Sequence, residues 1–300
     1  LRVDDNTGLL QALSQSKRVM AAFVLTPEQT GNNPYKSGHA LQFMSESLRD
    51  LDAQLRALGG RLHLFSGTTE SVITTLVTTG AIQAVYSNWD YTPYAHTRDA
   101  NLKQLCGTLN IGWHQTPDSL LHEPELVLKS DHKPYTVFRF FFKKAFLRIY
   151  KEGIREPRSC TAITWHTDRL AGEVDLAHLD TLVGQPNDLL AVRGGSTEAL
   201  GIIAKLNRHT DYKRMRDFPA LDATTHLSAH NKFGTVSIRR LYHAVASELG
   251  VSHAMITELH WREFFTHIGH HFPHVFGHAF DHRYEHIPWQ YNESHWQAWC

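Results

Sequence analysis

Four side chains in the last fifth of the sequence have the spacing of a single helical face. They stand at i, i+3, i+4 and i+7 of the run ELHWREFF and are Glu258, Trp261, Arg262 and Phe265. A carboxylate, an indole and a guanidinium together suit a planar, hydrogen-bonding, anionic ligand, because bases stack on aromatic rings and arginine binds phosphate. A core tryptophan beside a surface salt bridge would explain the same pattern equally well.

Hydroxyl side chains are dense in the preceding run DATTHLSAHNKFGTVS. Thr224, Thr225 and Ser228 lie near an expected helix start, where hydroxyl and backbone N–H groups can donate to phosphate oxygens. An ordinary capping turn is the alternative. Ser237 is predicted to cap a helix over residues 238–249.

Positive charge gathers just before these runs. The segment 205–216 carries five cations against the single acid Asp211, and they are Lys205, Arg208, Lys213, Arg214 and Arg216. The chain as a whole is neutral, with 30 Lys and Arg against 30 Asp and Glu, so any nucleic-acid surface must be local. A solvated helix face is the alternative.

Histidine is over-represented, with 22 residues. Several in residues 267–286 are three or four apart, a spacing that could place imidazoles on one face for a metal. The run contains no HExxH motif, and Pro273 and Gly277 interrupt it. We therefore predict surface and core histidines and no metal site.

The elements that must position these residues fall into two patterns. Strand-like runs at residues 18–25, 61–65, 83–87 and 111–114 alternate with helical patterns, which predicts an α/β unit with a Rossmann-like parallel sheet covered by helices. The loop 88–94 follows the third strand and is a candidate ligand-binding edge. A GxGxxG or Walker motif is absent, so standard dinucleotide or NTP binding there is not expected.

Long helical patterns follow residue 130, beginning with an aromatic run at 135–142 that we expect to pack in a core. The stretch 153–188 lacks periodicity and suits a connector. The predicted organisation is an α/β domain over 1–130, a helix and connector over 131–190, and an all-helical domain over 191–300.

The cysteine content and the lack of long apolar runs indicate the cellular compartment. The three cysteines, Cys106, Cys160 and Cys300, are too few and too scattered for a disulfide framework, which indicates a reducing environment. There is no apolar run of membrane-spanning length, and the first residues lack the pattern of a signal peptide. We expect a cytoplasmic monomer that does not enter a membrane.

Taken in order, four segments resemble one known family. They are YKRMRDFP at 212–219, DATTHLSAHNKFGTVSIR at 222–239, ELHWREF at 258–264 and IPWQYNESHWQAWC at 287–300. In order and spacing they are similar to the DNA photolyases and cryptochromes, and most similar to the photolyases that repair cyclobutane pyrimidine dimers. The start LRVDDNTGL and the loop SNWDYTPYAHTRD also resemble parts of that family's antenna domain.

The resemblance implies roles for individual residues. Contacts to the phosphates of FAD are implied for Tyr212, Thr224, Thr225, His226, Leu227 and Ser228. Contacts to ultraviolet-damaged DNA are implied for Arg216, Glu258, Trp261, Arg262 and Phe265. In catalysis, Glu258 would hydrogen-bond a flipped-out dimer, Trp261 would pack on it, and Trp289 would be the outermost tryptophan of a chain that passes electrons to the flavin.

The implied activity is light-dependent dimer repair by electron transfer from reduced FAD. A cryptochrome-type photoreceptor without repair activity and a non-catalytic nucleotide-binding module are the alternatives. The antenna chromophore, folate or deazaflavin, stays open, because Tyr94 and Ala95 stand where folate-using members have an amide and a carboxylate. Family members continue beyond Cys300 into the rest of the flavin domain, so we expect 300 residues alone to bind flavin weakly or not at all.

Overall fold

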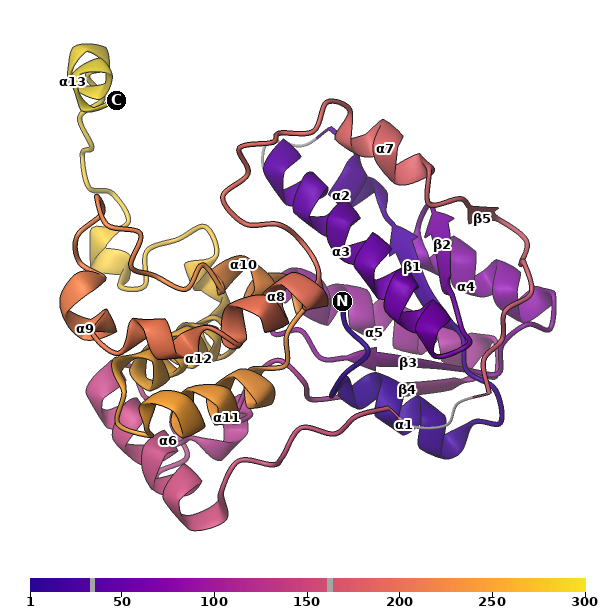
Figure 1. The fold of residues 1–300 in the computed structure, drawn as a ribbon, viewed down its shortest axis with the longest axis horizontal. Helices are drawn as coiled ribbons and strands as arrows, with labels where there is room; N and C mark the ends of the chain where they lie inside the picture. Colours follow the sequence, from indigo (N-terminus) through magenta and orange to yellow (C-terminus); the bar gives the residue numbers. More distant parts are fainter. Residues whose placement is uncertain (33–35, 161–163) are drawn as a thin grey trace.

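The computed structural model describes residues 1–32, 36–160 and 164–300. An α/β part and a helical part lie side by side (Figure 1). The α/β part contains four parallel-type strands, β1 (Ala21–Leu25), β2 (Leu62–Ser66), β3 (Ala84–Asn88) and β4 (Gly112–Thr116). Each lies within three residues of a predicted strand, since apolar runs bounded by turns and helical patterns mark buried strands well.

The strands form two sheets rather than the single sheet that we predicted. β1 pairs with β2 in parallel, from Ala21 opposite Leu62, and β2 also pairs with the antiparallel β5 (Glu173–Val174). β3 and β4 form a separate parallel pair. Within the described ranges, no strand pairs with the second edge of β1 or of β3. The predicted parallel pairing is confirmed, whereas the prediction of one continuous sheet is wrong. Hydrophobic periodicity identifies strands but does not show which strands lie next to each other.

Five helices cover these strands, namely α1 (Thr7–Gln15), α2 (Pro27–Thr30), α3 (Gly38–Ala57), α4 (Thr69–Thr78) and α5 (Pro93–Thr108). Leu48 and Leu55 of α3 pack with Leu25 and Leu64 in the largest buried cluster. The predicted glycine stop of α3 is confirmed, since Gly59 has a φ of 79°, a conformation that costs glycine little.

The connector packs on the α/β part. Trp165 and Leu179 are buried in its main cluster, the latter from α7 (His178–Val183). Val19 and Trp165 also form an isolated parallel bridge. The described residues of the connector, 153–160 and 164–188, thus have little regular structure, and part of them packs on the α/β core.

The helical part is built on long helices joined by short ones. Its elements are η1 (Pro124–Leu126), α6 (Phe138–Glu152), α8 (Ser196–Ile203), η2 (Leu206–His209), α9 (Tyr212–Met215), α10 (Ser228–Phe233), α11 (Ile238–Leu249), α12 (Ala254–His271), η3 (Pro273–Val275), η4 (His282–Tyr284) and α13 (Glu293–Trp299). The main cluster includes Leu206, Leu227, Leu241 and Ile256. The aromatic run 135–142 enters a core only in part, because Phe141 is buried and Phe140 is exposed.

A buried ionic network joins the first residues, the segment after β4 and α11. Arg239 donates to Asp5 (2.6 Å) and Asp118 (2.9 Å), and Arg2 donates to Asp118 (2.7 Å). Ser237 donates to the same carboxylate oxygen of Asp5 as Arg239 does. All five side chains are almost fully buried, so each charge depends on these partners to offset its loss of hydration.

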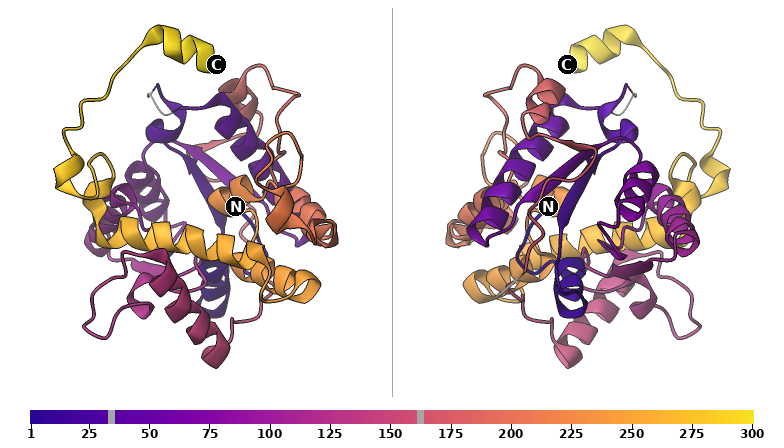
Figure 2. Two further views of the ribbon diagram at one scale, coloured as in Figure 1. Left: turned by 90° about the vertical axis from the view of Figure 1, so that its left-hand side faces the viewer. Right: turned by 90° about the vertical axis from the view of Figure 1, so that its right-hand side faces the viewer.

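The segment after η4 extends away from the rest of the molecule and ends in α13 (Figures 1 and 2). Its large side chains, including Trp289 and Trp299, are exposed. None of the helices in the described ranges combines the length and apolar character that crossing a bilayer requires.

Candidate functional site

The first part of the candidate site lies where α9 meets α12. The Arg216 guanidinium, just after α9, donates to the carboxylate of Glu258 on α12. Its Cζ atom also lies 5.7 Å from the centre of the Tyr212 ring, a cation–π distance. The hydrogen bond to Glu258 is the main cause that raises the pKa of Arg216 above its usual value. Three residues expected at the flavin and DNA sites therefore form one cluster.

The second part is an aromatic stack on the same helix. Trp261 lies face to face with Phe138 of α6, with ring centres 3.5 Å apart and planes 9° apart. Phe265 stacks on Trp261 at 5.7 Å and is 63% exposed. Trp261 thus contacts one ring from α6 and one from its own helix, and Phe265 is the ring that is exposed to solvent.

Arg262 points toward the segment after β4. Its guanidinium donates to the carbonyl of Ser119 (2.7 Å), and burial lowers its pKa. One donor is therefore already engaged within the protein. Arg262 shares the helix with Glu258 and Trp261, and its expected DNA contact stays a prediction.

Sequence reasoning missed a buried polar group on the opposite face of α12. Glu263 accepts from the backbone N–H of Leu121 and lies 3.3 Å from His122 Nδ1. His260, one turn earlier, is also fully buried, and burial lowers its pKa. The signal was available, because His260, Glu263 and His267 are spaced as one helical face. This face fixes the segment 117–126 to the helical part.

The hydroxyl run lies just before α10. Leu227 is buried in the helical core, and Tyr212 packs against the same cluster, so both ends of the expected flavin-phosphate site rest on one core. Thr224 and Ser228 are exposed, and neither hydroxyl has a hydrogen-bond partner in the described ranges. These free donors fit a phosphate group.

His226 has a positive φ of 55° and lies 2.5 Å from Asp222, so its ring is turned toward that carboxylate. Thr225 accepts weakly from the backbone N–H of Leu227 (3.4 Å). Short-range contacts therefore hold the local turn. The hydroxyl groups of Thr224 and Ser228 take no part in them and stay available to a ligand.

Trp289 is not brought to the other predicted residues. It is 72% exposed and lies in the extended segment before α13, which stands apart in both Figure 1 and Figure 2. Among the described aromatic contacts, its ring has none. Its electron-transfer role stays a prediction.

The loop 88–94 forms the start of α5. Thr92 caps that helix by accepting from Ala95 N–H (3.3 Å), and Tyr91 donates to Glu123 in a partly buried hydrogen bond. Burial is the largest cause that raises the pKa of Glu123. Tyr94 is exposed at this edge. In the described part of the chain, no three His, Cys, Asp or Glu side chains are placed to hold a metal ion.

The fold and the cluster define a protein with an α/β unit, a helical unit and, on the helical unit, a candidate ligand surface of aromatic, acidic and hydroxyl groups. A family model described as DNA photolyase matches residues 1–158, and one described as the FAD binding domain of DNA photolyase matches residues 255–300. The chain belongs to the DNA photolyase family.

Relatives extend this assignment. The chain is 28% identical to a deoxyribodipyrimidine photo-lyase of Synechococcus, and the match covers all of this chain and 64% of the relative. It is 35% identical to an archaeal photolyase from Sulfolobus tokodaii solved with two FAD molecules, with a TM-score of 0.85. That match covers 99% of this chain and 64% of the archaeal chain. A Synechocystis cryptochrome shares the fold at 22% identity, with a TM-score of 0.82 and coverages of 99% and 65%.

The chain therefore spans about 64% of the length of these first relatives. The second family match contains Glu258, Trp261, Arg262, Phe265 and Trp289. Tyr212, Arg216 and the hydroxyl run lie between the two matched segments, so their roles rest on local geometry and on the resemblance of their motifs.

Proposed function

We propose that this chain contributes the phosphate-binding side and the lesion-facing helix of a protein that repairs cyclobutane pyrimidine dimers in DNA with light and FAD. The observation that carries the proposal is the cluster at α9 and α12, where Arg216, Glu258 and the Trp261–Phe265 stack adjoin in a chain of this family. A flipped-out dimer needs both hydrogen bonding and stacking, and this surface offers both.

FAD, when bound, reduced and excited by light, would supply the electron that opens the dimer ring and would take it back afterwards. Thr224 and Ser228 would donate to its phosphates, and Tyr212 would lie beside them on the same core. Glu258 would accept a hydrogen bond from the pyrimidine N–H after Arg216 turns to a DNA phosphate. Phe265 and Trp261 would cover the exposed face of the dimer and exclude water from it.

The pairing of Arg216 with Glu258 does not prevent this exchange. Their side chains are 32% and 37% exposed, and ion pairs of that exposure contribute less than about 1 kcal/mol. A DNA phosphate and a dimer that arrive together can replace both halves of the pair at little cost. We therefore expect the Arg216–Glu258 pair to separate when DNA with a dimer binds.

The test is light-dependent repair by the protein purified as its natural gene product. An oligonucleotide with one thymine dimer is illuminated with blue light, and recovery of thymine absorbance is followed. We expect Glu258→Gln to slow repair at saturating DNA by about tenfold, because the carboxylate's charge-assisted hydrogen bonds are lost.

The control is Glu248→Gln, since Glu248 is an exposed glutamate at the end of α11 with no described partner. It should repair at the wild-type rate. Bound FAD without any dimer splitting in the wild type would contradict the repair proposal and leave a photoreceptor. Equal rates for the two variants would contradict the role of Glu258.

A further inference from the structure

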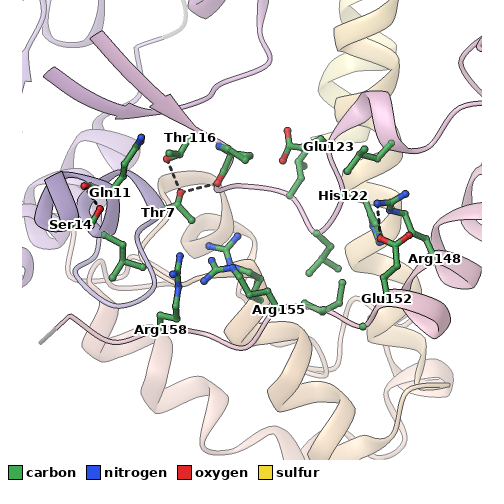
Figure 3. A pocket seen from close by; sticks show the side chains of 18 residues that line it. Thr7, Gln11, Ser14, Thr116, His122, Glu123, Arg148, Glu152, Arg155 and Arg158 are labelled. Carbon is green, nitrogen blue, oxygen red and sulfur yellow. Dashed lines mark hydrogen bonds and ion pairs between the residues drawn. The ribbon is translucent and has the colours of Figure 1, made fainter. Parts of the chain in front are cut away.

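A cavity of about 540 Å³ opens between the α/β part and the helical part (Figure 3). Its walls come from α1, from the segment after β4, and from the end of α6 with the connector residues 153–158. The residues expected to bind FAD or damaged DNA do not line it. Its volume is in the range of small-molecule sites.

Three arginines gather at one wall of this cavity. Figure 3 shows Arg155 and Arg158 directed into it from the connector, and Arg239 of α11 also lines it. Asp5 accepts from Arg239 (2.6 Å) and from Arg155 (3.0 Å), so its charge is shared. The Arg158 guanidinium has no ion pair or hydrogen bond within the part of the chain that the structure describes.

Around this wall the four cations Arg2, Arg155, Arg158 and Arg239 outnumber the two acids, Asp5 and Asp118, that neutralise part of their charge. Burial lowers the pKa of Arg155, and the charges of Arg239 and Arg158 lower it further against the attraction of Asp5. Like charges held this close favour a bound anion. The place for such an anion is at the unpaired Arg158 guanidinium, beside Arg155.

Other parts of the cavity wall are apolar. Leu10 of α1, Leu120 of the segment after β4 and Ile154 of the connector line it. Gln11 of α1 also lines it, and its side-chain carbonyl oxygen is buried with no hydrogen-bond partner in the described residues. An unpaired buried acceptor costs free energy, which the Gln11 amide would recover by turning its oxygen toward a ligand donor in the cavity. An apolar wall with one free acceptor suits a flat ring that carries an amino group.

We propose that this cavity binds a phosphate-bearing ligand of mononucleotide size, with its phosphate at Arg155 and Arg158 and its ring between Leu10 and Leu120. The amino group of the base donates to Gln11. This site goes beyond the proposed repair function and does not depend on it, because no predicted flavin or DNA residue takes part.

The test is titration calorimetry in the dark with AMP, adenosine and inorganic phosphate as separate ligands. We expect AMP to bind at least about tenfold more tightly than either of the others, since it alone engages both the arginines and the apolar wall. Equal affinity of AMP and phosphate would contradict the ring site. Equal affinity of AMP and adenosine would contradict the arginine site, and no binding of AMP would overturn the proposal.

Two variants show whether AMP binds in this cavity. Arg158→Gln should weaken both AMP and phosphate by about tenfold or more, while Gln11→Leu should weaken AMP alone. Arg193→Gln is the matched control, because Arg193 lies outside the cavity and pairs with Glu46 (2.8 Å). Unchanged AMP affinity in Arg158→Gln would place AMP elsewhere and contradict the proposal, provided that circular dichroism shows both variants folded.

Discussion

Glu258 and Arg216 belong to distant segments and meet as a pair, which is the kind of contact that spacing alone does not predict. The sequence did predict that Glu258, Trp261 and Phe265 share a face, because all three lie on one helix. It did not predict that Phe138 would cover one side of Trp261. Local periodicity defines a face, whereas the partner of that face comes from the fold.

The prediction at the residue scale concerns the pH dependence of stability. Burial lowers the pKa of His267 and of His230 from 6.5 to about 4. Between pH 6.5 and 4 the unfolded chain binds protons that the folded chain does not, so folding stability falls as the pH falls through this range. His267 faces Phe141 on α6, His270 and His271 on its own helix, and Glu125 on η1. We expect each buried histidine to contribute on the order of 2 kcal/mol to this loss.

The measurement is urea unfolding between pH 4.5 and 7.5. His267→Leu should remove a measurable share of the pH dependence, and His230, His260 and His271, whose pKa values burial also lowers, account for further shares. His295→Leu, at an exposed position on α13, is the control and should retain all of it. A His267→Leu protein whose stability falls as steeply as that of the wild type would contradict this assignment.

At the scale of elements, caps decide where prediction succeeds. Helix α11 has the predicted bounds, because Ser237 caps it by accepting from Arg239 N–H (3.2 Å) and Gly250 ends it at a φ of 92°. Helix α1 was missed, although Asn6 caps it in the same way by accepting from Leu9 N–H (3.2 Å). Its nine residues are too few for a clear apolar period.

The residue that caps α11 also binds a buried charge, and the prediction at the scale of elements concerns its effect on stability. Ser237 also donates to the buried carboxylate of Asp5. We expect Ser237→Ala to lower the free energy of unfolding by about 2–3 kcal/mol, because it removes both a cap and a donor to a buried charge.

Thr68→Ala is the matched control, since Thr68 caps α4 by accepting from Ser71 N–H (3.3 Å) at the surface. It should cost only about 1 kcal/mol. Chemical unfolding at neutral pH measures both, and equal losses would show that the bond to Asp5 contributes nothing.

For the molecule as a whole, the sequence predicted an α/β part and a helical part but not the contacts that join them. Apolar periodicity located the strands and the long helices, but Asp5 and Asp118 gave no sign that they would be buried beside Arg2 and Arg239. The two partners of each of these ion pairs are more than 100 positions apart in the chain, and one sequence carries no signal for such pairing. The predicted boundaries near residues 130 and 190 stay predictions.

The junction supplies the prediction at this scale. Asp118→Ala would leave two buried guanidinium groups without their shared carboxylate, so we expect a loss of about 3–5 kcal/mol. The two parts should then unfold in separate steps. Fluorescence of the helical-part tryptophans and far-ultraviolet circular dichroism should coincide during wild-type unfolding and diverge in Asp118→Ala. Coincident curves in the variant would show that the network does not couple the two parts.

The central claim is that the α12 surface recognises a flipped-out dimer, and equilibrium binding tests it most directly. Fluorescence anisotropy would compare one oligonucleotide with a single thymine dimer and the same oligonucleotide undamaged, with wild type, Trp261→Ala and the exposed control Trp296→Ala. We predict that wild type and Trp296→Ala prefer the dimer at least tenfold, and that Trp261→Ala loses about tenfold of that preference while its affinity for undamaged DNA is unchanged. Equal binding of both oligonucleotides by the wild type, or an undiminished preference in Trp261→Ala, would contradict it.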